Sequence, residues 1–154
     1  MALFDVIREL CDAQTNFGGL TTSEGLVSED IINLGDSDLN FGAGEPLYLN
    51  IRVNTAFTSG GSPATDITLY ASTNATVNAS DSEVYTLRTN VDLTGYSAGD
   101  YVFRGALPVK VDEEQYIGLY VQNATAEYTA GALDAWIGHG PQSDHDTQVA
   151  SSNI

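Results

Sequence analysis

Residues 44–72 read GEPLYLNIRVNTAFTSGGSPATDITLYAS, and the fold class follows from the alternation within them. Apolar and polar side chains alternate over 47–54 and again over 67–72, which places the apolar ones on one face of a strand. The segment 58–64 between them is rich in Ser and Gly and contains Pro, so it favours a turn. The stretch therefore predicts two antiparallel strands of a half-buried sheet.

Similar short stretches occur along the rest of the chain, separated by segments rich in Gly, Ser, Asp and Asn. Strands are predicted at 30–34, 83–89, 101–111, 115–123 and 133–138, and loops at 17–28 and 92–100. Pro108 marks an edge or a bend, because proline cannot donate a hydrogen bond to a neighbouring strand. Seven or eight short strands predict an all-β fold, an antiparallel β-sandwich of the jelly-roll type.

The two ends of the chain differ from this pattern. Apolar residues within 1–16 recur at helical spacing, but Phe4 and Val6 would also share one side of an extended arm. We therefore expect either a short amphipathic helix or an arm over 1–16, packed on its own domain or reaching a partner. The sandwich is expected over 17–139, followed by a polar tail over 140–154.

The net charge of the chain limits the kinds of partner that it can bind. Its 154 residues fit one domain, with 21 acidic and 5 basic residues and a formal net charge of −16. Such a surface repels phosphate backbones and anionic membranes and favours basic partners, so we expect no direct nucleic-acid or membrane binding. Arg8 and Glu9 interrupt the apolar start, which is not expected to be a secretory signal. A single cysteine, Cys11, excludes an internal disulfide.

One motif resembles that of a serine hydrolase. Residues 95–99 read GYSAG and match G-x-S-x-G, and Asp134 and His139 follow in hydrolase order. This motif supports catalysis only on a strand-to-helix turn of a parallel sheet, whereas here it falls in a turn between β segments. We therefore expect no catalytic residues and no enzymatic activity.

Two acidic segments resemble metal sites. Residues 36–40 imitate the start of a calcium loop, but Phe41 and Leu47 stand where an EF-hand needs glycine and glutamate. The 144–146 segment, Asp-His-Asp, lies in the polar tail without a second ligand set. We expect no bound metal and no cofactor.

Aromatic side chains on the polar faces of strands are candidates for a binding surface. An exposed sheet face would carry them: Tyr48, Tyr70, Tyr120 and Trp136. Such a face would suit protein docking or a carbohydrate platform, because each ring buries area while its polar atom stays solvated. Ordinary strand propensity also explains these residues.

Four stretches, in order, resemble the capsid cement, or decoration, proteins of short-tailed phages of the Bordetella-phage type. These are M-x-L-F-D…DAQ at 1–14, IINLG at 31–35, the stretch at 44–72, and QYIGLYV at 115–121. The resemblance covers most of the chain, and it weakens over 75–105 and after residue 138.

The resemblance implies a jelly roll on the outer surface of an icosahedral head, made in the host cytoplasm. It implies binding to major capsid protein subunits of the HK97-type fold, homodimers near two-fold positions, and clamping of neighbouring capsomers against packed DNA. We expect the N-terminal segment to supply the docking anchors, Leu3, Phe4, Val6 and Ile7. The alternative function is a carbohydrate-binding or host-adhesion module on the virion, because jelly rolls with exposed aromatic residues also bind sugars.

Overall fold

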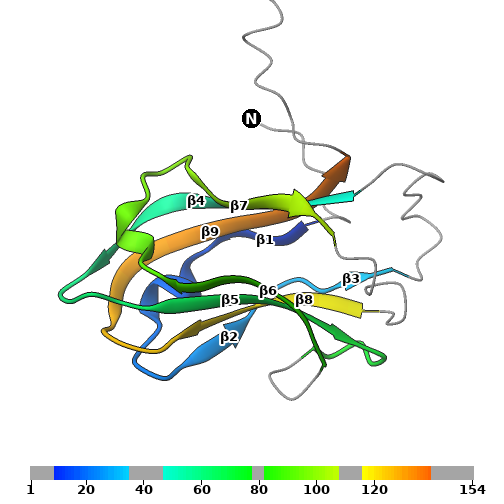
Figure 1. Ribbon diagram of the computed structural model, residues 1–154, viewed down its shortest axis with the longest axis horizontal. Helices are drawn as coiled ribbons and strands as arrows, with labels where there is room; N and C mark the ends of the chain where they lie inside the picture. The colour runs from blue at the N-terminus through cyan, green and yellow to red at the C-terminus, as the bar shows by residue number, and fades with distance from the viewer. Residues whose placement is uncertain (1–8, 35–46, 78–81, 108–115, 140–154) are drawn as a thin grey trace, which may run out of the picture.

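The computed structural model describes residues 9–34, 47–77, 82–107 and 116–139, which form two antiparallel sheets packed face to face (Figure 1). The four-stranded sheet contains, in spatial order, β1 (Glu9–Gln14), β9 (Tyr128–His139), β4 (Leu47–Ser59) and β7 (Tyr101–Ala106). The five-stranded sheet contains β2 (Gly25–Val27), β8 (Tyr116–Asn123), β5 (Thr65–Ser72) and β6 (Ser82–Val91), with β3 (Ile32–Asn33) also paired to β8.

The strand order is that of a jelly roll. Because β2 and β3 pair with successive parts of β8, they together fill one strand position, and the sandwich has eight positions. The orders β1-β9-β4-β7 and β2-β8-β5-β6 are those of two interlocked Greek keys. The predicted antiparallel β-sandwich is confirmed. The described residues contain no α-helix, only the 3-10 turns η2 (Thr15–Gly19) and η3 (Leu93–Gly95).

The core lies between the two sheets and is formed by the apolar faces of the strands. The alternation over 47–54 and 67–72 is confirmed, since the core includes Leu49, Ile51, Val53, Ile67 and Leu69. These two strands are not neighbours in one sheet, however. β4 pairs with β9 and β7, β5 pairs with β8 and β6, and their apolar faces meet across the sandwich. The alternation gives each strand a buried face but does not determine its neighbour.

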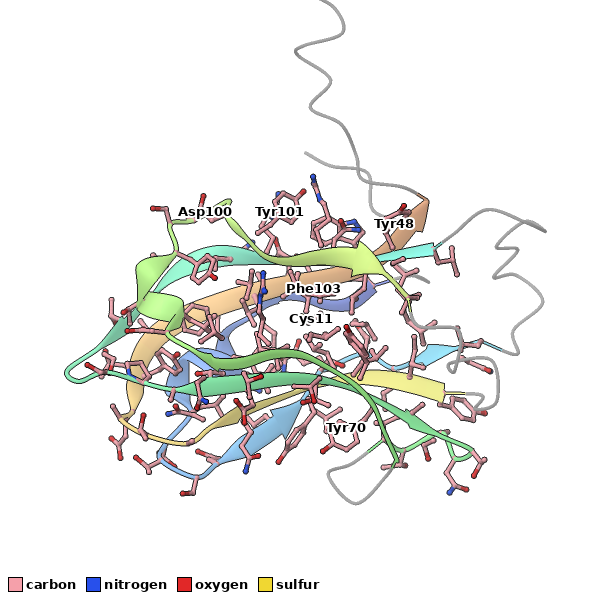
Figure 2. All side chains as sticks on the ribbon, viewed as in Figure 1. Cys11, Tyr48, Tyr70, Asp100, Tyr101 and Phe103 are labelled. Atoms are coloured by element: carbon pink, nitrogen blue, oxygen red, sulfur yellow. The ribbon has the colours of Figure 1, made fainter. Side chains whose placement is uncertain are left out.

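Of the alternatives for 1–16, the helix is wrong for the second half, which is extended and packs on its own domain. Strand β1 pairs with β9, so the sandwich begins at Glu9, eight residues earlier than predicted. A register shift between Glu9 and Cys11 sends both Leu10 and Cys11 into the core, which hides the alternation of the strand. Figure 2 shows Cys11 between the two sheets. The segment 17–28, expected to be a loop, contains strand β2. Residues 1–8 and 140–154 lie outside the described residues.

Two side chains join the sheets along the open sides of the sandwich. On one side, Gln14 of β1 donates to Val27 O at 3.3 Å and accepts from Glu29 N at 2.9 Å. On the other side, Arg88 of β6 donates from Nε to Val102 O of β7 at 2.8 Å. Each bond satisfies a polar group at a sheet edge and fixes one layer relative to the other.

Candidate docking surface

The outward side of the four-stranded sheet combines aromatic and charged side chains, and we call it the outer face. It consists of Tyr48, Asn50, Arg52, Tyr101, Arg104, Asp134 and Trp136. The β4 members alternate with core residues and therefore point away from the other sheet. Figure 2 shows Tyr48 and Tyr101 on this side of the upper layer, whereas Tyr70 projects from the opposite layer.

Strand register arranges the outer face in two rows. One row crosses the sheet from Tyr101 of β7 through Arg52 of β4 to Asp134 of β9. The next row holds residues from all four strands, Arg104, Asn50, Trp136 and Glu9. Side chains in neighbouring strands of one row are close enough to interact, so the rows define the contacts of the face.

Asp134 is the polar centre of the first row. Only 3% of its surface is exposed, and its carboxylate accepts from Arg52 Nη2 at 2.5 Å and Nε at 3.2 Å. Asn54 Nδ2 donates to it at 3.3 Å, and the Ala13 backbone N–H of β1 donates at 2.8 Å. Four donors from two strands, β4 and β1, therefore compensate the buried charge and fix the Arg52 side chain in place.

Trp136 is the apolar centre of the second row. It points outward, yet only 4% of its surface is exposed because neighbouring groups cover its ring. The Arg52 guanidinium lies 5.5 Å from the ring centroid, and the Tyr101 ring lies 6.1 Å away. A cation held over an aromatic face is favourable, so Arg52 links the carboxylate of one row to the indole of the other.

The β7 edge of the outer face presents an exposed arginine on a tyrosine. The guanidinium carbon of Arg104 lies 3.8 Å from the centroid of the Tyr101 ring, and 37% of Tyr101 is exposed. In the described part of the chain, no carboxylate lies within ion-pair distance of Arg104. The edge therefore presents a positive charge whose donors are not used by any carboxylate among the described residues.

The opposite edge of the face, at β1, is acidic. Burial raises the pKa of Glu9, and the nearby carboxylates of Asp12, Asp134 and Asp30 raise it further. Three strand spacings, about 14 Å, separate β1 from β7. The outer face therefore has a negative edge and a positive edge, with the tryptophan between them.

The structure divides the four predicted aromatic residues between two faces. Tyr48 and Trp136 belong to the outer face, whereas Tyr70 and Tyr120 lie on the five-stranded sheet, with ring centroids 5.1 Å apart. The prediction of one exposed face is therefore wrong, because β4 and β5 are in different sheets, and Trp136 is buried by its neighbours. The predicted anchors lie outside the described residues: Leu3, Phe4, Val6 and Ile7.

Two residues of the outer face, Tyr101 and Arg104, were not predicted from the sequence. Residues three apart in a regular strand point to opposite sides. Here the register shifts, since Ile51 pairs with Phe103 while Arg52 pairs with Tyr101, so that Val102 is an extra residue. This bulge brings Tyr101 and Arg104 to one face, and no signal in the sequence marks it.

The hydrolase-like residues do not assemble into a site. The loop of Ser97 lies beside Val53, whose O accepts from Gly99 N at 2.7 Å. His139 pairs with Leu47, six residues away along β4, which is about 20 Å in an extended strand. Asp134, the third residue, is bound to Arg52.

The predicted metal-like segments and the single cysteine are placed as follows. Among them, no three His, Cys, Asp or Glu side chains are grouped to hold a metal ion. The acidic segments 36–40 and 144–146 lie outside the description. Cys11 is buried, burial raises its thiol pKa, and its Sγ donates to Leu133 O at 3.5 Å.

No helix in the described ranges is long and apolar enough to cross a membrane.

These features define a jelly-roll protein with one polarised aromatic face, within a fold class that includes viral capsid and lectin domains. A family model, Bbp16, matches residues 18–137, and the chain therefore belongs to the Bbp16 family. The family name indicates a protein of a Bordetella bacteriophage. No curated protein matches the chain significantly.

Proposed function

We propose that this protein is a capsid decoration, or cement, protein that binds the outside of a phage head and clamps adjacent major capsid protein subunits. The observation that carries the proposal is membership of a phage protein family over residues 18–137, combined with the jelly-roll fold. The sequence resemblance to phage cement proteins points the same way. The capsid subunits are expected to have the HK97-type fold, and the decoration protein is expected to act as a homodimer.

The sandwich would act mechanically. Each copy that bridges two capsid subunits adds buried interface, of the order of 1,200–2,000 Å² for a stable protein contact. A ligand that binds only the assembled shell stabilises that shell by mass action, and many copies act together. Hydrogen bonds from the Gln14 and Arg88 side chains join the two sheets. They help the sandwich to transmit force between capsid subunits without deforming.

The charge of the chain supports a role in assembly. A net charge of −16 opposes aggregation of the free protein before it binds. The same charge attracts basic patches on a capsid surface and raises the association rate, an effect that salt screens.

Co-sedimentation of the purified protein with phage heads that lack it tests the proposal. We expect saturable binding that weakens between low and high salt, and decorated heads that retain their DNA at higher temperature than bare heads. A protein that stays in the supernatant at every salt concentration would overturn the proposal. Binding to a glycan array would instead support the adhesion function, whereas a cement protein should give no signal there.

A further inference from the structure

We infer that this protein docks on the major capsid protein of the phage head through the β7 edge of its outer face. In this contact, Arg104 receives a carboxylate of the capsid protein. The inference rests on the proposed function and names the docking face and the chemistry of the contact. The carboxylate is an Asp or Glu side chain exposed on the partner surface.

The composition of the face is the first argument. Arg, Tyr and Trp are the residue types that contribute most binding energy at protein interfaces. All three meet here, where Arg104 lies on Tyr101, Tyr101 lies beside Trp136, and the Arg52 guanidinium lies over the Trp136 ring. A contact that covers Tyr101 would remove its exposed 37% from water, next to an indole that is already buried.

Preorganisation is the second argument. Arg52 is fixed by Asp134, and the Tyr101 ring below Arg104 limits the positions of that guanidinium. A guanidinium held on an aromatic ring keeps its edge donors available for the two oxygens of a carboxylate. Because part of the ordering takes place on folding, less conformational entropy is lost on binding.

Charge complementarity is the third argument and selects the occupant. The chain has only five basic residues against 21 acidic ones, and two of the three arginines in the described residues lie on this face. Arg52 is already paired to Asp134, so among the described residues of this face Arg104 is the cation that can pair with an incoming anion. A polyanion such as nucleic acid is repelled by the net charge, whereas one carboxylate on an otherwise neutral or basic protein surface is not.

The test uses the full chain and heads that lack it, with two pairs of matched variants. Arg104→Gln removes the proposed cation, and Gln122→Glu changes the net charge by the same amount at an exposed position of β8 in the other sheet. Tyr101→Ser removes the stacking ring, and Tyr85→Ser removes an exposed ring on β6, which is 50% exposed. Thermal melts show that each variant is folded before its binding is measured.

We expect the dissociation constant to rise about tenfold or more for Arg104→Gln and for Tyr101→Ser, and to stay within about twofold for the two controls. If wild type binds and Arg104→Gln binds as well as Gln122→Glu, the docking face is wrong and the decoration function stands. If wild type does not bind heads, the decoration function is overturned and the docking face with it.

A cross-linking experiment detects the partner carboxylate directly. Arg104→Lys places a primary amine at this position, and a carbodiimide joins an amine to a nearby carboxylate as an amide with loss of water. On decorated heads, we expect a cross-linked peptide pair between residue 104 and an Asp or Glu of the head. Saturated binding that yields no cross-link at residue 104 would contradict the inference.

Discussion

Arg52 and Asp134 face each other directly across β4 and β9, with the Arg52 Nη2 atom 2.5 Å from Asp134 Oδ2. The pair joins the interior strands of the sheet to the edge strand β1, because Asp134 Oδ1 also accepts from the Ala13 N–H at 2.8 Å. Ala13 has a φ of 48°, a strained value for a residue with a side chain. The carboxylate therefore both supports the outer face and holds β1 in its irregular register.

Replacement of this carboxylate should destabilise the fold strongly. Asp134→Ala removes the buried carboxylate to which the Arg52 guanidinium and the Ala13 N–H both donate, and we expect a loss of about 3 kcal/mol in the free energy of unfolding. Urea denaturation measures this loss. Asp66→Ala is the matched control, since Asp66 accepts a single exposed bond from Asn90 N and should cost less than about 1 kcal/mol. Equal losses for the two variants would contradict the central role of Asp134.

Gly131 of β9 should tolerate no side chain. Its φ is +139°, and a Cβ there would lie 2.3 Å from Cδ1 of Phe57, whose ring packs on Tyr128 with centroids 5.0 Å apart. Gly131→Ala must displace this buried pair, so we expect a destabilisation of about 2–3 kcal/mol by thermal or urea unfolding. Gly60→Ala, in the exposed turn after β4, meets no atom within 4 Å and should change stability by less than about 0.5 kcal/mol.

The stability of the β1 edge should depend on pH through Glu9. Burial and neighbouring carboxylates raise the pKa of Glu9 above its ordinary value of 4.5, so the folded state binds this proton more tightly than the unfolded chain. The resulting stabilisation is complete below pH 4.5 and is lost as the pH rises through the raised pKa of the folded state.

Glu9→Gln removes this dependence. We therefore expect the variant to be slightly more stable than wild type at pH 7 and to lose that advantage as the pH falls through the raised pKa of the folded state to 4.5. Urea unfolding at several pH values measures the difference. Glu127→Gln, at an exposed position, controls for the change in net charge. An advantage of Glu9→Gln that grew on acidification would contradict the assigned direction of the shift.

The sequence predicted the sandwich because apolar alternation survives wherever a strand is regular, as from Leu47 to Val53. It failed where bulges interrupt the period of two. The register shift in β1 buries both Leu10 and Cys11, and the shift in β7 brings Tyr101 and Arg104 to one face. Bulges arise from pairing with a neighbouring strand, so a local pattern does not show them.

The aromatic face was mispredicted for a related reason. Alternation correctly identified Tyr48 and Tyr70 as outward residues, but the assignment of two strands to one sheet depends on long-range topology. The burial of Trp136 also results from distant residues, because Arg52 and Tyr101 reach it only after three strands are in register. Side-chain direction was therefore predictable, whereas the composition of a face was not.

Removal of the N-terminal segment should separate docking from folding. The expected anchors end at Ile7, while the first strand begins at Glu9 and contributes Leu10 to the core. A variant that lacks residues 1–7 should keep its unfolding midpoint and lose its binding to heads, because the anchors would add apolar contact to that made by the outer face. A longer deletion through residue 10 would remove a core side chain and lower the free energy of unfolding by about 2–5 kcal/mol. A loss of binding could then result from unfolding instead of from the missing anchors. Full decoration of heads by the variant lacking residues 1–7 would show that the outer face is sufficient and that the N-terminal segment has no part in docking.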